Sequence, residues 1–141
     1  MRIACSLGSL LSVEQVIECT KMISETKIDS IWIPETWGME NFSMLGAVAN
    51  ITKIQKIGSS IINIYSRSPS TIAMGSATTD TLSDGRLILG LGTSSIPIVE
   101  DFHGEKFENP VQRMREYVEI IRLSLSKKQI NYSGKIFNLK N

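Results

Sequence analysis

Short apolar runs alternate along this chain with longer stretches in which apolar residues recur every three or four positions. Continuous apolar runs are typical of strands buried on both faces, and the longer stretches are typical of helices with one apolar face. We expect four strands, at 3–7, 30–34, 56–64 and 86–91. A last segment, 130–139, predicts two short strands around Ser133-Gly134.

Capping residues mark where the intervening helices begin. Ser12 and Gln15 have the spacing of a capping box, and Asn41 is predicted to cap the second helix. Ser68-Pro69 and Asn109-Pro110 predict two more helix starts. The backbone N–H at the first helical position has no partner within the helix, so proline, which lacks this N–H, is accommodated there without loss. In the last helix, the apolar residues spaced three and four apart are predicted to face the core: Val111, Met114, Val118, Ile121 and Leu125.

Strands and helices in regular succession predict a parallel sheet with right-handed crossovers in a single domain, 1–141. Two α/β architectures fit this pattern. One is a small doubly wound sheet that is complete in itself, and the other is the first half of a (β/α)8 barrel, which normally needs about 250 residues. In both, ligands bind at the carboxyl ends of the strands.

Composition excludes several classes of partner. The 141 residues are 42% hydrophobic and 21% charged, with a formal net charge of +1, so the charge excess of nucleic-acid and membrane-surface binders is missing. No apolar run approaches the ~20 residues that span a bilayer. Cys5, Cys19 and the single His103 have no metal-site spacing. We expect both cysteines to be buried thiols of a cytoplasmic protein.

Polar residues follow three of the expected strands. Glu35 comes after the second strand, where a carboxylate could bind a ligand or move a proton, and Asn63 lies at the carboxyl end of the third. The segment 90–95, GLGTSS, lacks the third glycine of a dinucleotide fingerprint and the Lys of a phosphate-binding loop. Each of these features is equally compatible with an ordinary turn, cap or strand end, and the residues alone leave both interpretations open.

Four segments together carry a family resemblance: Asp29–Glu35 (DSIWIPE), Ile57–Pro69 (IGSSIINIYSRSP), Leu82–Ser94 (LSDGRLILGLGTS) and Val111–Leu125 (VQRMREYVEIIRLSL). In this order they resemble the bacterial-luciferase-like monooxygenase superfamily. Within it, the chain looks most similar to deazaflavin-dependent reductases of the methylenetetrahydromethanopterin reductase type.

The resemblance implies a (β/α)8 TIM barrel that holds coenzyme F420, a deazaflavin, or alternatively FMN, at its C-terminal face. It implies hydride transfer between the cofactor and a small organic substrate, with pterin-linked compounds as one class. Glu35 corresponds to the acidic, catalytic position near the cofactor. The cofactor-binding positions are Ser60, Ile61 and Asn63 behind the ring, and Gly92, Thr93 and Ser94 in the loop beside it. The family pattern also predicts a non-prolyl cis peptide bond at Ser60-Ile61.

The chain departs from the family in length and at two positions. It supplies about four of the eight βα units, has Ser6-Leu7-Gly8 where the reductases carry a carboxylate, and has Thr36 where many relatives have histidine. These departures leave four possibilities open. They are an F420-dependent reductase, an FMN-dependent monooxygenase, a non-catalytic flavin-binding half barrel, and a complete small α/β domain with no cofactor. A half barrel is expected either to belong to a longer polypeptide or to pair with a second chain, for instance as a homodimer.

Overall fold

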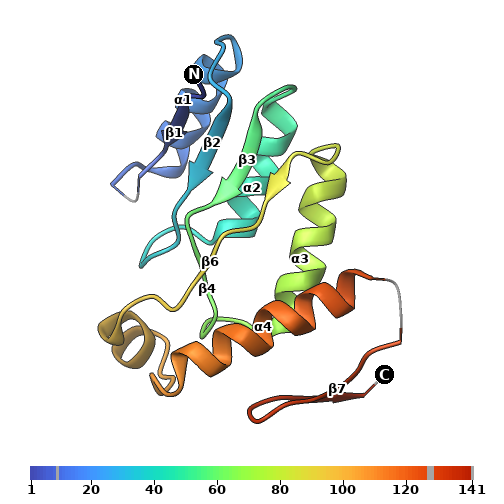
Figure 1. Cartoon of the computed structure of the whole chain (residues 1–141). Coiled ribbons are helices and arrows are strands. Elements are labelled where there is room, and N and C mark those ends of the chain that lie inside the picture. The colour runs from blue at the N-terminus through green and yellow to red at the C-terminus, as the bar shows by residue number, and fades with distance from the viewer. Residues whose placement is uncertain (9, 127–128, 141) are drawn as a thin grey trace. The chain divides into compact units, whose positions relative to one another are not determined.

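The computed structural model describes residues 1–8, 10–126 and 129–140 (Figure 1). The chain divides into two compact units. The first consists of Met1–Ile62 and Thr78–Leu91, and the second of Asn63–Ala77 and Gly92–Asn141. That these units form a single domain stays a prediction.

The expected alternation of strands and helices is present along the described chain. In order, the elements are β1 (Ala4–Ser6), α1 (Val13–Ser24), β2 (Ser30–Ile33), α2 (Asn41–Ile51), β3 (Lys56–Ser59), β4 (Ile62–Asn63), α3 (Pro69–Leu82), β5 (Leu87–Ile88), β6 (Leu91–Gly92), the π-helix η1 (Pro97–Phe102), α4 (Pro110–Leu125), β7 (Asn131–Ser133) and β8 (Asn138–Lys140).

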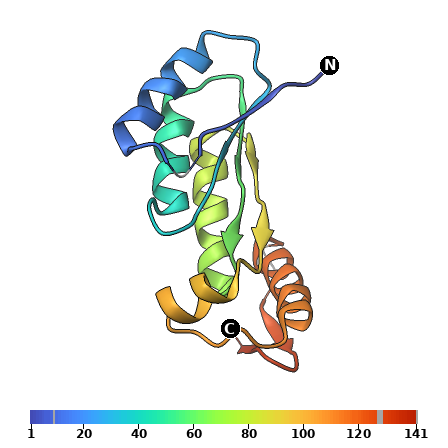
Figure 2. The same cartoon turned by 90° about the vertical axis from the view of Figure 1, so that its left-hand side faces the viewer.

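The first unit is built on a parallel sheet with the strand order β1-β2-β3-β5. Ser30 of β2 pairs with Ala4 on one side and with Lys56 on the other, so the three strands start level. Helices α1 and α2 lie on the same side of the sheet (Figures 1 and 2). This arrangement confirms the parallel sheet that the sequence predicts.

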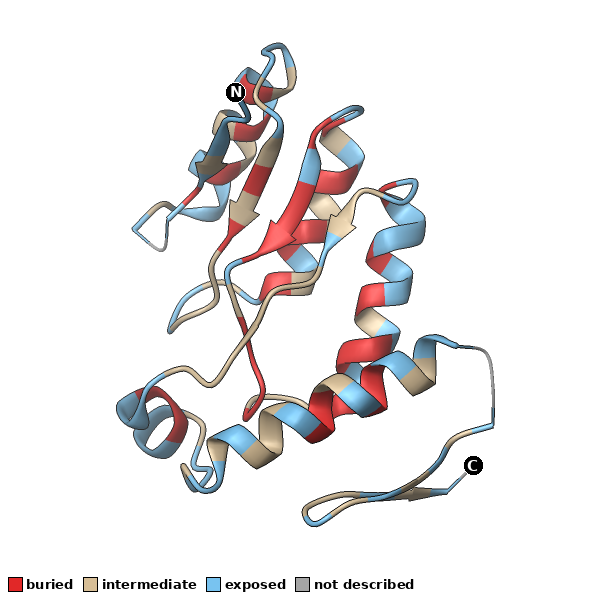
Figure 3. Cartoon of the chain, viewed as in Figure 1, coloured by how far each residue is buried: buried red, intermediate tan, exposed pale blue. Residues whose placement is uncertain are grey.

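Side chains of the sheet alternate between a helix-covered face and an uncovered one. Ile31, Ile33 and Ile57 are completely buried against α1 and α2. Trp32 lies between two of them on the opposite face, because side chains alternate along a strand, and it is half-buried. Figure 3 shows the corresponding alternation of intermediate and buried residues along β2. The Trp32 ring lies over Gly58 on the paired strand, where a Cβ atom would come within 2.6 Å of the indole. Glycine at this position therefore lets the large ring lie flat on the sheet.

The two helices α1 and α2, which lie wholly within the first unit, begin at capped ends. The predicted capping box is confirmed: Gln15 N donates to Ser12 Oγ over 3.3 Å, and Ser12 N donates to Gln15 Oε1 over 2.8 Å. The prediction for α2 is wrong by one residue, because its cap is Glu40, whose carboxylate accepts from the amides of Phe42 and Ser43. Asn41 is buried, since its side chain is committed to the sheet.

Arg86 joins the end of α2 to the start of β3. Its Nη1 donates to Thr52 Oγ1 and Gln55 O over 2.8 and 2.7 Å, and its Nη2 donates to Ala49 O and Thr52 O over 3.0 Å each. Burial lowers the pKa of the guanidinium, and nearby Asp84 opposes that effect. One side chain thus satisfies the carbonyls that the last turn of α2 leaves without helical partners.

Two of the predicted strands are interrupted. The strand expected at 56–64 is divided into β3 and β4, and the one expected at 86–91 is replaced by β5 and β6. The interruptions are residues 60–61 and 89–90, and they lie opposite each other. Just beyond them the chain pairs again, since Ile62 N donates to Gly90 O and Ile64 N to Gly92 O. Apolar composition predicts that a segment is extended and buried, but it cannot show where its hydrogen-bonding changes partner.

The second unit has its own core around α4, and the predicted core face of this helix is confirmed at Ile121, which is buried, but not at its two ends. Val111 is 76% exposed and Leu125 46% exposed, whereas Tyr117 and Ile120 are buried. Tyr117 packs edge-on against Phe137 of the terminal hairpin, with ring centres 5.3 Å apart. The helix is therefore rotated toward the hairpin, a partner that periodicity within the helix does not reveal.

Glu116 on α4 holds the turn of the β7–β8 hairpin, whose two strands confirm the predicted terminal pair. Its buried carboxylate accepts from the backbone amides of Lys135, Ile136 and Phe137 over 2.9–3.2 Å. Gln112 Nε2 donates to the same carboxylate over 2.7 Å. Gly134 passes so close that a Cβ atom there would overlap the carboxylate. Burial raises the pKa of Glu116, but these hydrogen bonds outweigh it and hold the pKa below its usual 4.5.

We expect Arg86→Met to destabilise the protein by roughly 3 kcal/mol, because it leaves buried carbonyl groups without donors. Urea unfolding followed by circular dichroism measures this change. Arg122→Met, at an exposed site on α4, is the control and should stay within about 0.5 kcal/mol of the parent. Equal stabilities of the two variants would contradict the role given to Arg86.

We expect Glu116→Gln to destabilise the hairpin by about 1–3 kcal/mol at neutral pH, because an amide cannot accept all four donors. A depressed pKa in the folded state means that the carboxylate stabilises the fold above its ordinary value of 4.5. That contribution is lost as the pH falls through the lower, folded-state pKa. Hydrogen exchange of the amides of residues 135–137 should therefore distinguish parent and variant at pH 7 and converge in acid. Exposed Glu18→Gln is the matched control.

Candidate functional site

Glu35 lies in the segment between β2 and α2, half-buried and attached to the start of the helix. Its Oε1 accepts from the backbone amide of Asn41 over 3.1 Å, and Asn41 Nδ2 donates to Ile33 O over 2.7 Å. Ser60 N donates to the same Ile33 carbonyl over 2.9 Å. The end of β2, the start of α2 and the residue after β3 are thus joined through Ile33. The structure brings the predicted Glu35 and Ser60 to this one edge of the sheet.

The peptide bond between Ser60 and Ile61 is cis, as the family resemblance predicts. Ser60 is exposed and Ile61 is half-buried, although the residues on either side of this pair are buried. The chain therefore presents two residues at the point where β3 ends and β4 begins.

Ser59 and Gly90 determine the shape of this segment, and their pairing is not apparent from the sequence. Ser59 Oγ donates to Gly90 O over 2.9 Å and accepts from Gly90 N over 2.8 Å. A Cβ atom on residue 90 would overlap the Ser59 carbonyl oxygen. A glycine inside an apolar strand is an indication of such close backbone approach, and it was the one available sign here.

Asn63 in the second unit is buried and helps to shape the turn that follows β4. Its Oδ1 accepts from Tyr65 N over 2.9 Å, which is the turn role that the sequence left open. Ile64 N donates to Gly92 O over 3.0 Å, so the predicted Asn63 and Gly92 lie on neighbouring strands.

Thr93 and Ser94 follow β6 and are half-buried. Ser94 adopts a left-handed backbone with φ of 59°, where the chain turns toward η1. Within the described residues, neither hydroxyl makes a hydrogen bond to the protein. These hydroxyls can therefore donate to or accept from a polar ligand.

The chemistry of these residues fits a flavin or deazaflavin ring. Such a ring has an apolar face and a rim of carbonyl and ring-nitrogen groups. Ile61 offers an apolar surface, and Ser60, Thr93 and Ser94 offer hydroxyls. Glu35, Ser60 and Ile61 belong to the first unit, and Asn63, Gly92, Thr93 and Ser94 belong to the second.

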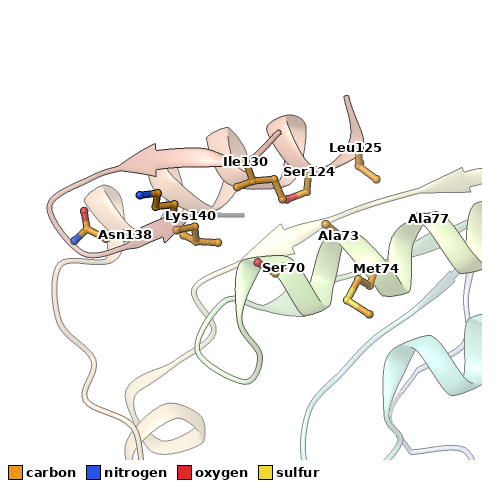
Figure 4. Close-up of a pocket in the computed structure, with 10 residues that line it drawn as sticks. Ser70, Ala73, Met74, Ala77, Ser124, Leu125, Ile130, Asn138 and Lys140 are labelled. Carbon is orange, nitrogen blue, oxygen red and sulfur yellow. The ribbon is translucent and has the colours of Figure 1, made fainter. Parts of the chain in front are cut away.

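Two hollows of the described chain are lined by other residues. One of about 680 Å³ lies on the uncovered face of the sheet, beside Trp32 and Ile88. Another, of about 620 Å³, is a mainly apolar groove in the second unit between α3, α4 and β8, lined by Ala73, Ala77 and Leu125 among others (Figure 4). Neither contains a residue predicted to bind the cofactor.

The described residues contain no group of three or more histidine, cysteine or acidic side chains placed to hold a metal ion. Among their helices, none combines the length and the apolar character needed to cross a membrane. Cys5 and Cys19 are unpaired thiols, half-buried rather than buried as predicted, since each lies at the edge of the core and not inside it.

Comparison with known proteins gives a match over the whole chain. The profile of the family described as luciferase-like monooxygenase matches residues 1–141. A solved structure, the FMN complex of the oxygenating constituent of 3,6-diketocamphane monooxygenase from Pseudomonas putida, superposes with a TM-score of 0.86 at 18% identity. The superposition covers 99% of this chain and 44% of that one. The chain thus folds as part of a (β/α)8 barrel, and the doubly wound alternative is set aside.

Two curated relatives are similar in sequence. A putative coenzyme F420-dependent oxidoreductase of Mycobacterium tuberculosis is 35% identical over 105 residues, which is 74% of this chain and 30% of that protein. The 5,10-methylenetetrahydromethanopterin reductase of Archaeoglobus fulgidus is 36% identical over 118 residues, which is 83% of this chain and 35% of that protein. The chain spans about a third of the length of these relatives.

We expect Gly90→Ala to destabilise the protein by about 2 kcal/mol, because the new methyl group has to displace the Ser59 backbone. Gly46→Ala on α2 is the matched control, since its Cβ atom would meet Leu82 Cδ1 at 4.0 Å. There the change should be neutral or stabilising by up to about 1 kcal/mol. Chemical denaturation compares the two, and a Gly90→Ala protein as stable as Gly46→Ala would refute the close approach.

Proposed function

The chain belongs to the luciferase-like monooxygenase family, and from this premise we propose that it forms part of an F420-dependent oxidoreductase. In this proposal, hydride passes between coenzyme F420 and a small organic substrate. The observation that carries it is the 35% identity to a relative named for its dependence on this coenzyme. The similarly close methylenetetrahydromethanopterin reductase supports pterin-linked one-carbon compounds as one substrate class.

The deazaflavin ring would supply the hydride chemistry, while the protein orients and surrounds it. Ser60 and Ile61 would support one face of the ring, because they are the two accessible residues between the buried ends of β3 and β4. Asn63, Gly92, Thr93 and Ser94 would lie along its rim. The hydroxyls of Thr93 and Ser94, which lack hydrogen bonds to the described protein, would pair with polar atoms there.

Glu35 is proposed as the group that handles a proton at the substrate. Its carboxylate is held by the amide of Asn41, so it stays at the carboxyl end of β2. A side chain in a fixed position is what general acid–base chemistry requires. The same contact gives Glu35 a structural role at the start of α2, and the experiment has to separate the two roles.

Two other functions draw support from specific observations. The FMN complex of the diketocamphane monooxygenase shares this fold, which keeps an FMN-dependent oxygenation as an alternative. In the part of the chain that the structure describes, the sheet of the first unit ends in strands β1 and β5 and carries no helix of that unit on its second face (Figure 2). Unpaired edges of this kind favour association, which supports a flavin-binding half barrel that dimerises without catalysis. We place the protein in the cytoplasm, where unpaired thiols such as Cys5 and Cys19 persist.

Titration of the purified chain with F420 and with FMN, followed by absorbance and fluorescence, tests the proposal. We expect saturable binding of F420 in preference to FMN. Thr93→Val, which removes the hydroxyl and keeps the volume, should weaken binding about three- to tenfold. Ser95→Ala, an exposed neighbour, is the control and should bind like the parent.

Each outcome of this experiment favours one of the three proposed functions. Binding of neither cofactor would refute the proposal for this chain, and preference for FMN would favour the monooxygenase. Binding without hydride exchange, together with a dimer in light scattering, would favour the non-catalytic module. If substrate is reduced, Glu35→Gln should lower kcat by more than the accompanying loss of folded protein explains. A fall in kcat that only follows the loss of thermal stability would make Glu35 purely structural.

A further inference from the structure

Arg113, in the first turn of α4, is surrounded by aromatic rings of the second unit. Its guanidinium carbon lies 4.4 Å from the centre of the Tyr65 ring, 5.3 Å from that of Phe137 and 5.8 Å from that of Tyr117. Tyr65 and Tyr117 are themselves fixed, because their hydroxyls donate to Glu108 O and Arg67 O over 2.8 and 2.6 Å. The cation is therefore held in place by ring faces.

The donors of this guanidinium have no partner in the described part of the chain. No hydrogen bond or ion pair of the Arg113 side chain occurs there, and its Nε is buried. Arginine carries five N–H donors, and buried polar groups nearly always find acceptors. By contrast, Arg86 uses its guanidinium fully within the protein. Arg113 is thus oriented for an acceptor that the described protein does not supply.

Arg113 lines a cavity of about 440 Å³, together with Lys106, Lys135 and the carboxylates of Glu105 and Glu108. Both lysines are exposed, and within the described chain neither forms an ion pair with these carboxylates. Three cations against two carboxylates give the lining a net charge of +1. The lysines come from separate segments, the loop before α4 and the hairpin turn, so they flank Arg113 from two directions.

We propose that this cavity binds a compact phosphate-type oxyanion, with the Arg113 fork at its base and Lys106 and Lys135 at its rim. A planar guanidinium matches two oxygens of a phosphoryl group, and lysines add point charges. Glu105 and Glu108 restrict the ligand to one compact anionic group, because a longer polyanion would approach their carboxylates. The site shares no residue with the proposed cofactor positions, so the inference goes beyond the proposed function.

An NMR titration with inorganic phosphate tests the site, with chloride as the reference anion at the same ionic strength. The amide resonances of residues 104–109, 113 and 135–136 report binding. We expect saturable shifts confined to these segments. Lys106→Met/Lys135→Met, at exposed positions that leave the fold intact, should weaken phosphate binding tenfold or more. Glu105→Gln/Glu108→Gln should instead tighten it, since repulsion is removed. Arg122→Met, on the same helix outside the cavity, should leave it unchanged.

Arg113→Lys keeps the charge over the rings and loses the fork, so it should fold like the parent and bind phosphate more weakly. Absence of saturable shifts with phosphate would overturn the proposal and make Arg113 a packing residue. Equal weakening by Arg122→Met and by the double lysine variant would also overturn it, because general charge would then explain the binding. Neither result depends on whether the chain binds F420.

Discussion

The hydroxyl of Ser59 fixes the backbone of the first unit at the end of β3, where residue 90 approaches it. It donates to the carbonyl of Gly90 and accepts from the amide of the same residue, so one buried side chain satisfies both polar groups of that peptide segment. The bonds from Ile62 N to Gly90 O and from Ile64 N to Gly92 O follow in the same register. Residues 60–61, which belong to the candidate site, directly follow Ser59. The contact with Gly90 therefore fixes where these two residues leave the sheet of the first unit.

Much of the first unit could be predicted from local patterns. The capping box of Ser12 and Gln15, and the burial of Ile31 and Ile33, follow from rules that act within a few residues. The second unit depends on contacts that are distant in sequence. Glu116 is a charged residue in a helix, and hydropathy places it at the surface. It is buried because three amides some twenty residues later converge on it. For that reason the buried face of α4 agrees with the prediction at Ile121 but not at Val111 or Leu125.

The candidate site was predictable in position but not in detail. Strand order indicated the carboxyl ends of the strands, and Glu35, Ser60 and Asn63 lie there. The cis bond at Ser60-Ile61 came from the resemblance of a whole segment and not from any single residue. Two partners were missed. Ser59 looked like one more small residue in an apolar strand, and Asn41 looked like a helix cap, while the structure uses both to fix the backbone around the site.

The contact between Gly134 and Glu116 has an evolutionary consequence. Because any side chain at position 134 would overlap the carboxylate at position 116, a first change at the glycine is selected against while the glutamate remains. Conversely, losing the glutamate first leaves three turn amides without their acceptor. Neither single step is neutral, so the two positions should be inherited together. Sequences that have replaced one should have remodelled or deleted the hairpin as a whole.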